Sequence, residues 1–222
     1  MPHPSPNLRR SAIALAVATC AVSAAMADMV PFTENASLST SGLGSFSGTL
    51  TYTYLGSGNG RLDVAMTNTT RPDIGGFITA FMFRVPESMG AVSSSLATWD
   101  NGVNSNIPSG TNAPPFPGTW IGGAGVAPDW LSHGAVHDGI GVGSTGHWSF
   151  NISGENASLL SAASFIYDSV NLDPYAFIVR FRGMALQPDG SDSDKVPGRD
   201  VPAPGAAALV GLAGLLSRRR RS

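Results

Sequence analysis

Hydrophobic and polar residues alternate most clearly between residues 48 and 68. Large apolar side chains take every second position on both sides of a glycine-rich stretch, GSGNG at residues 56–60, and threonines fill the gaps in the first half. The apolar positions are Leu50, Tyr52 and Tyr54 before the glycines and Leu62, Val64 and Met66 after them. A period of two is typical of strands with one buried face, so the segment predicts a β-hairpin with a glycine-rich turn.

Three further segments have the character of strands. Residues 77–86 form a continuous apolar run that ends at a proline, which predicts a strand buried on both faces. Residues 146–153 place apolar side chains at alternate positions, and residues 177–182 separate aromatic and aliphatic positions from two arginines, Arg180 and Arg182. Between these two segments, residues 156–168 start at a good capping residue, Asn156, and predict one short helix of two to three turns.

Residues 99–146 contain little periodicity and many glycines and prolines. A loop of this length is uncommon in a compact domain, so we expect short strands near Trp120 and Trp130, with both indoles packed against the body. Many short strands joined by glycine and proline turns are typical of an antiparallel β-sandwich or jelly roll. We therefore predict a mainly β ectodomain of this class over residues 28–188, with one short helix.

The N-terminal residues have the layout of a secretory signal peptide. Arg9 and Arg10 precede an apolar stretch over residues 12–25, which closes on the small-x-small sequence Ala25-Met26-Ala27. A first transmembrane helix is the alternative, but the stretch is shorter than the roughly 20 residues that a span needs. We therefore expect a signal peptide at residues 1–27, cleaved between Ala27 and Asp28.

Composition and charge narrow the classes of function. Cys20, the one cysteine of the chain, lies in the expected signal peptide, so thiol and iron–sulfur chemistry are excluded for the mature protein. Seven basic and fifteen acidic residues lie between Asp28 and Asp200, which gives this part a formal charge of −8. A surface of this sign repels phosphate backbones, and we therefore expect no nucleic-acid partner.

Two clusters offer ligand types for metals. His133, His137 and His147, with Asp138, carry donors that suit zinc, and they suggest a metal-assisted hydrolase as one hypothesis. Glycines between them make a helix improbable, so their spacing implies no fixed geometry, and exposed loop histidines are the simpler interpretation. In the second cluster, Asp189, Asp192 and Asp194 could bind calcium, but an acidic linker over residues 189–200 fits the same composition.

Aromatic residues are the third candidate feature. Trp99, Trp120, Trp130 and Trp148 would suit a carbohydrate-binding surface if they formed an exposed row, because aromatic faces stack on sugar rings. Core packing is the more common use of tryptophan. The sequence contains no G-x-S-x-G nucleophile motif, and we assign no catalytic residue.

The C-terminal residues combine a proline pair, an apolar run and four arginines. The run from Gly205 to Leu216 is 12 residues, about 18 Å as a helix, against a hydrocarbon core of about 30 Å. It is therefore too short for a durable span. By the positive-inside rule the arginines stay in the cytoplasm, with the body outside.

In this order, the three features resemble the PEP-CTERM sorting signal of exported bacterial proteins, over residues 201–222. Pro202 and Pro204 match the two prolines of the family motif, with Ala203 where glutamate is usual, and Arg218, Arg219, Arg220 and Arg221 match its basic cluster. The resemblance implies export, transient anchoring in the inner membrane and processing by an exosortase-type enzyme, often in organisms that make exopolysaccharide.

We therefore expect an exported protein of the cell surface or extracellular matrix, structural or adhesive and without catalytic activity. A carbohydrate-binding module for exopolysaccharide is the alternative, and the metal-dependent hydrolase is a third hypothesis. We expect no cofactor, although calcium is a candidate ion for the aspartate cluster.

Overall fold

The computed structural model describes residues 27–131, 134–166, 174–185 and 193–201. It is mainly β. The strands are β1 (Ala27–Glu34), β2 (Phe46–Gly56), β3 (Asn59–Asn68), β4 (Gly75–Phe83), β5 (Val92–Trp99), β6 (Ser105–Ile107), β7 (Gly122–Gly125), β8 (Ile140–Gly141), β9 (Thr145–Gly154), β10 (Phe177–Met184) and β11 (Ser193–Asp200). The helical turns among these described residues are 3-10 helices: η1 (Ala36–Leu38), η2 (Glu87–Met89), η3 (Val136–Asp138), η4 (Ala157–Leu159) and η5 (Ala162–Phe165).

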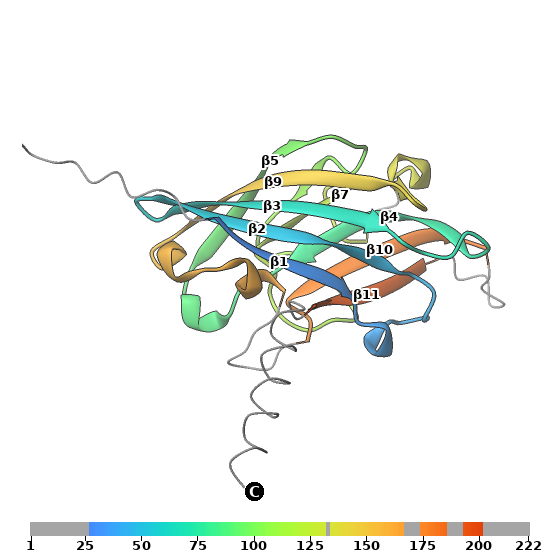
Figure 1. Cartoon of the computed structure of the whole chain (residues 1–222), viewed down its shortest axis with the longest axis horizontal. Helices are drawn as coiled ribbons and strands as arrows, with labels where there is room; N and C mark the ends of the chain where they lie inside the picture. Colours follow the sequence, from blue (N-terminus) through green and yellow to red (C-terminus); the bar gives the residue numbers. More distant parts are fainter. Residues whose placement is uncertain (1–26, 132–133, 167–173, 186–192, 202–222) are drawn as a thin grey trace, which may run out of the picture.

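The strands form one antiparallel sheet in the order β5-β9-β3-β2-β1-β11-β10-β4-β7-β6, and β8 pairs with β4 (Figure 1). The sheet curls until its two ends nearly meet. Side chains bridge the seam: Asn106 Oδ1 on β6 accepts a hydrogen bond of 2.8 Å from the Leu96 amide on β5, and Ser94 donates to the Ile121 carbonyl. The predicted antiparallel β class is confirmed, but the expected two layers are parts of one sheet that is almost a closed barrel.

The predicted hairpin is confirmed as β2 and β3, with Leu50 opposite Val64 and Tyr52 opposite Leu62. Gly56, Ser57 and Gly58 have positive φ values of 94°, 51° and 73°, and Ser57 and Gly58 are the pair at the tip of the turn. Such a pair matches the twist of the two strands, which is why glycine-rich sequences favour this connection.

The interior of the sheet is filled by aromatic rings from strands on opposite sides. Phe81 of β4 stacks on Phe177 of β10 with ring centroids 5.6 Å apart, and contacts the edge of Trp148 from β9 at 4.7 Å. The rings of Phe83 and Phe150 of β9 pack edge to face with their centroids 4.9 Å apart. Because these residues are almost completely buried, the main apolar core lies between the two curled halves of the sheet.

A second, smaller core covers the outer side of β4 and β10. There Ala80, Met82 and Ile178 pack against residues that the long loop supplies. The prediction that residues 77–86 are buried on both faces is confirmed for β4 by this cover. Trp120 and Trp130 are both packed as expected; β7 begins two residues after Trp120, whereas Trp130 lies in a turn.

The predicted helix over residues 156–168 is wrong. Its described part forms two 3-10 turns, η4 and η5, separated by Leu160 in an extended conformation with φ −74° and ψ 149°. Ser161 then starts a new turn through a capping box with Ser164. Serine competes for backbone hydrogen bonds at turn starts, and this local capping divides the segment.

The acidic linker expected over residues 189–200 is also wrong in its described part. Residues 193–200 form β11, which lies between β1 and β10 and joins the two halves of the sheet. A polar strand is stable here because Asp194 finds hydrogen-bond donors inside the protein, as described below. None of the helical turns in the described residues is long and apolar enough to cross a bilayer.

Candidate functional site

The outer side of β2, β3 and β9 is rich in hydroxyl groups. Residues opposite one another in an antiparallel sheet point to the same side, so the pairing register places threonines and serines in rows across these strands. We call this surface the hydroxyl face. It comprises Ser47, Thr49, Thr51, Thr53, Arg61, Asp63, Ala65, Thr67, Thr145, His147, Ser149 and Asn151.

Two adjoining hollows cross the hydroxyl face. The first, of about 360 Å³, lies at the β5 end and includes Trp99, Asp100 and His147 in its lining. The second, of about 570 Å³, lies toward β1 and includes Pro31. Thr49 and Ala65 line both hollows, so the hollows adjoin at these residues, and we call the two together the groove.

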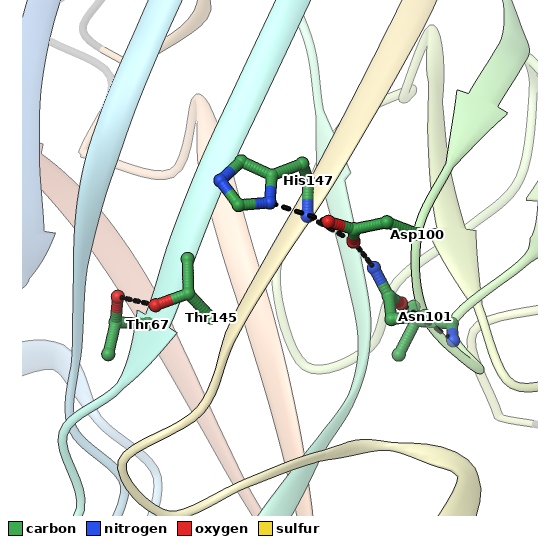
Figure 2. Close-up of polar contacts among 6 residues, drawn as sticks. Thr67, Asp100, Asn101, Thr145 and His147 are labelled. Atoms are coloured by element: carbon green, nitrogen blue, oxygen red, sulfur yellow. Dashed lines mark hydrogen bonds and ion pairs between the residues drawn. The ribbon is translucent and has the colours of Figure 1, made fainter.

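A carboxylate and an imidazole meet at the β5 end of the groove (Figure 2). Nδ1 of His147 lies 2.7 Å from Oδ2 of Asp100, and the His147 amide donates to Oδ1 at 2.8 Å. Asn101 donates a further hydrogen bond to Oδ1. Burial acts to raise the pKa of Asp100, but the hydrogen bonds from Asn101 and His147 and the charge of His147 together lower it. Asp100 is therefore ionised at neutral pH and accepts hydrogen bonds from several sides.

A second carboxylate lies on β3 in the same hollow. Asp63 accepts a hydrogen bond of 2.9 Å from Arg61, two residues earlier on the same face, and another from the Ser149 hydroxyl on β9. These contacts orient the carboxylate on the floor of the groove.

The second hollow is lined by neutral groups. Thr67 and Thr145 face one another across β3 and β9, with their hydroxyl oxygens 2.7 Å apart (Figure 2). Thr33 donates to the Phe46 carbonyl, and Pro31 and Val201 add apolar surface. The groove thus offers donors, acceptors and small apolar patches along its length, which is the chemistry of a binding surface for polar molecules.

The four tryptophans do not form the exposed row that sequence analysis considered. Trp120, Trp130 and Trp148 are buried, and Trp148 donates its indole N–H to the Val103 carbonyl at 2.7 Å. Trp99, at the end of β5, is 48% exposed and lines the groove. One indole therefore remains for stacking on a ligand.

The histidines of the hydrolase hypothesis have separate environments where they are described. The His137 ring packs edge-on against Phe77, 5.2 Å between centroids, whereas His147 pairs with Asp100. His133 lies outside the described residues. Within the described parts of the chain, no three His, Cys, Asp or Glu side chains are grouped in a way that could hold a metal ion.

Asp194, one of the three aspartates considered for calcium, is fully buried. Its carboxylate oxygens accept hydrogen bonds from the hydroxyls of Ser39 and Thr40 and from three amides of the loop, those of Ser41, Leu43 and Gly44. Burial acts to raise the pKa of Asp194, but the donors, led by the Gly44 amide and the Ser39 hydroxyl, lower it. This carboxylate fixes the loop before β2. Asp189 and Asp192 lie outside the described residues.

Ala27 and Asp28, which flank the expected signal cleavage, are the first two residues of β1. Asp28 accepts a hydrogen bond of 2.8 Å from the Ala162 amide at the start of η5. The proposed sorting residues Pro202, Ala203 and Pro204 and the arginines 218–221 lie outside the described residues.

Sequence reasoning missed the groove. The threonines of β2 were visible as the polar half of the alternating pattern, which is a signal for an outward face. The pairing of Asp100 with His147, which are 47 positions apart, had no local signal because it depends on how β5 lies against β9. Comparisons of the chain with protein-family models, with curated proteins and with solved structures found no match.

Proposed function

We propose that this protein is an exported, non-catalytic surface protein that adheres to polysaccharide through the groove on its hydroxyl face. The observation that carries the proposal is the half-exposed indole of Trp99 beside two oriented carboxylates and rows of hydroxyls. Sugar rings have one apolar face and many hydroxyls, so they are bound by an aromatic platform together with polar groups that fix orientation.

The fold is compatible with the proposed export route. The described strands run from Ala27 to Asp200, so cleavage after Ala27 removes one residue of β1, and processing beyond Val201 removes none of the strands. We propose that the C-terminal segment holds the protein briefly in the inner membrane until an exosortase-type enzyme releases it to the cell surface or matrix. The support for this step is the resemblance of residues 201–222 to the sorting signal.

Affinity electrophoresis in gels that contain a soluble polysaccharide tests the binding function. We expect at least one polysaccharide to retard the protein, and Trp99→Ala to weaken this binding about tenfold, the order of magnitude of one lost aromatic contact. Trp99→Phe retains an aromatic face and is expected to keep most of the binding.

Leu159→Ala is the matched control, because Leu159 is also an exposed apolar residue but lies on η4, outside the groove lining. Equal loss in Trp99→Ala and Leu159→Ala would contradict the assignment of the groove.

Mass spectrometry of the protein isolated from its natural cell tests the export route. We expect an N-terminus at Asp28 and recovery from the envelope or medium. An uncleaved N-terminus on protein from the cytoplasm would refute export. It would not affect the conclusion on polysaccharide binding, which is tested separately.

A further inference from the structure

We propose that the groove binds a polysaccharide without acidic groups, as an extended chain of several sugar rings that lies across the strands. The inference rests on the proposed function and adds the class, length and direction of the ligand. Three features of the groove carry it: its span, the charge of its lining and the position of its indole.

The span of the groove calls for a polymer. From Trp99 on β5 to Pro31 on β1 the groove crosses β9, β3 and β2. Four steps between neighbouring strands are roughly 19 Å at the usual strand spacing. A mono- or disaccharide covers only one end of this length, whereas a longer chain contacts the indole on β5 at one end and Pro31 and Thr33 on β1 at the other.

The charge of the lining disfavours an acidic ligand. Asp63 and Asp100 line the groove, and the one basic side chain among the described lining residues is His147, which already pairs with Asp100. The neighbouring Arg61 is held by Asp63. A carboxylate or sulfate on the ligand would therefore meet two negative charges without a lysine or arginine of the described lining to compensate it, and such repulsion is an efficient source of specificity.

The same carboxylates favour neutral sugars. An ionised carboxylate accepts hydrogen bonds from hydroxyl groups, and such bonds are stronger than those between neutral partners. Asp63 and Asp100 are oriented in advance by Ser149 and by Asn101, so less ordering is needed when a ligand binds. Threonine hydroxyls further along both donate and accept, which matches the hydroxyls of any sugar ring.

The experiment compares pairs of polymers with one backbone and different charge: dextran with carboxymethyl dextran, and hydroxyethyl cellulose with carboxymethyl cellulose. Affinity electrophoresis of the full chain is run at constant ionic strength. We expect retardation by at least one neutral member and binding of its carboxymethyl partner that is weaker by about tenfold or more. Competition with short and long oligosaccharides of the same backbone should show affinity that rises with chain length.

Asp100→Asn sharpens the test because it removes one of the two charges from the lining. The ratio of the affinity for the neutral polymer to the affinity for its carboxymethyl partner should be smaller in this variant. Asp73→Asn, an exposed aspartate paired with Arg71 outside the groove lining, should leave the ratio unchanged.

The possible results distinguish failure of the neutral-polymer inference from failure of polysaccharide binding itself. Equal or stronger binding of the carboxymethyl polymers overturns the inference and leaves polysaccharide binding intact. A disaccharide that competes as well as a long oligomer overturns the extended-chain part. If none of the four polymers retards the protein, or Trp99→Ala changes nothing, the proposed function falls together with the inference.

Discussion

Of the two outer faces of the curled sheet, one is open to solvent and the other is covered by a loop. The hydroxyl face of β2, β3 and β9 presents threonines and serines that are half-buried or exposed. The outer face of β4 and β10 carries Ala80, Met82 and Ile178. A second core buries this face under the covering loop, which comprises residues 108–121 and 126–131 on either side of β7. The same antiparallel ladder therefore serves as an open polar surface on one side and as a platform for an irregular loop on the other.

The covering loop is held by aromatic anchors and by side chains that donate hydrogen bonds to its carbonyls. Arg180 of β10 donates to the Trp130 carbonyl at 2.6 Å, and Trp130 donates its indole N–H to the Pro114 carbonyl. Trp120 lies under the guanidinium of Arg84, 5.0 Å from the ring centroid. A long loop thus becomes ordered when it contributes large apolar side chains and when arginines bond its carbonyls. The two faces differ because apolar side chains on β4 and β10 gain free energy from burial, whereas the hydroxyl groups of the hydroxyl face remain hydrated.

Removing an anchor of the covered face should have the largest effect. Trp130→Ala deletes an almost fully buried indole and should lower the free energy of unfolding by about 3–5 kcal/mol, as is typical of large-to-small core substitutions. Urea unfolding followed by far-UV circular dichroism measures this.

Trp99→Ala is the control on the open side, and we expect a loss of less than about 1 kcal/mol because that indole is half exposed. Similar losses in both variants would show that the two faces do not differ as described.

Two carboxylates with lowered pKa values offer the next comparison, since Asp194 is buried and Asp100 is exposed. Asp194→Asn places an NH2 group among donors and should cost about 2–3 kcal/mol, the scale of hydrogen bonds to a charged group. Asp100→Asn should change the free energy of unfolding far less, because water can replace the lost contacts. An unfolding midpoint for Asp194→Asn equal to that of the natural protein would contradict the role of Asp194 in fixing the loop.

Lowering the pH should remove the contribution of Asp194 to stability. Because the pKa of Asp194 is lowered in the folded protein, its contribution to stability is complete above the unfolded value of about 3.9 and is lost as the pH falls through the folded value. The difference in unfolding free energy between the natural protein and Asp194→Asn should therefore narrow below about pH 4. Urea unfolding at a series of pH values measures it, and a constant difference would refute the linkage.

The smallest effect on stability is expected on the hydroxyl face. Thr51→Val keeps the shape and the β-branched character of a half-buried residue on β2, so the free energy of unfolding should change by no more than about 0.5 kcal/mol. In affinity electrophoresis, the affinity of this variant for polysaccharide should nevertheless be lower, because Thr51 lines the groove. A large loss of stability would show that this face is structural rather than a binding surface.

Local pattern was sufficient where burial follows the strand period. The alternation at Leu50, Tyr52, Leu62 and Val64 predicted the hairpin, and the continuous run of β4 predicted burial on both faces. Pattern failed for β11, because a strand that buries Asp194 among loop amides has the composition of a linker. It failed again at residues 156–166, where serine capping divided a segment of helical period.

By itself, the sequence determined the antiparallel β class, the outward threonines of β2 and the burial of Trp120 and Trp130, because each depends on the side chains of one short segment. Only the tertiary structure decided that the sheet nearly closes, that one outer face is covered, and that Trp99, Asp100 and His147 meet Asp63 in one groove. The physical reason is that these features depend on which strands become neighbours and in what register. The meeting of residues 63, 100 and 147 in the lining of one hollow cannot be read from their spacing along the chain.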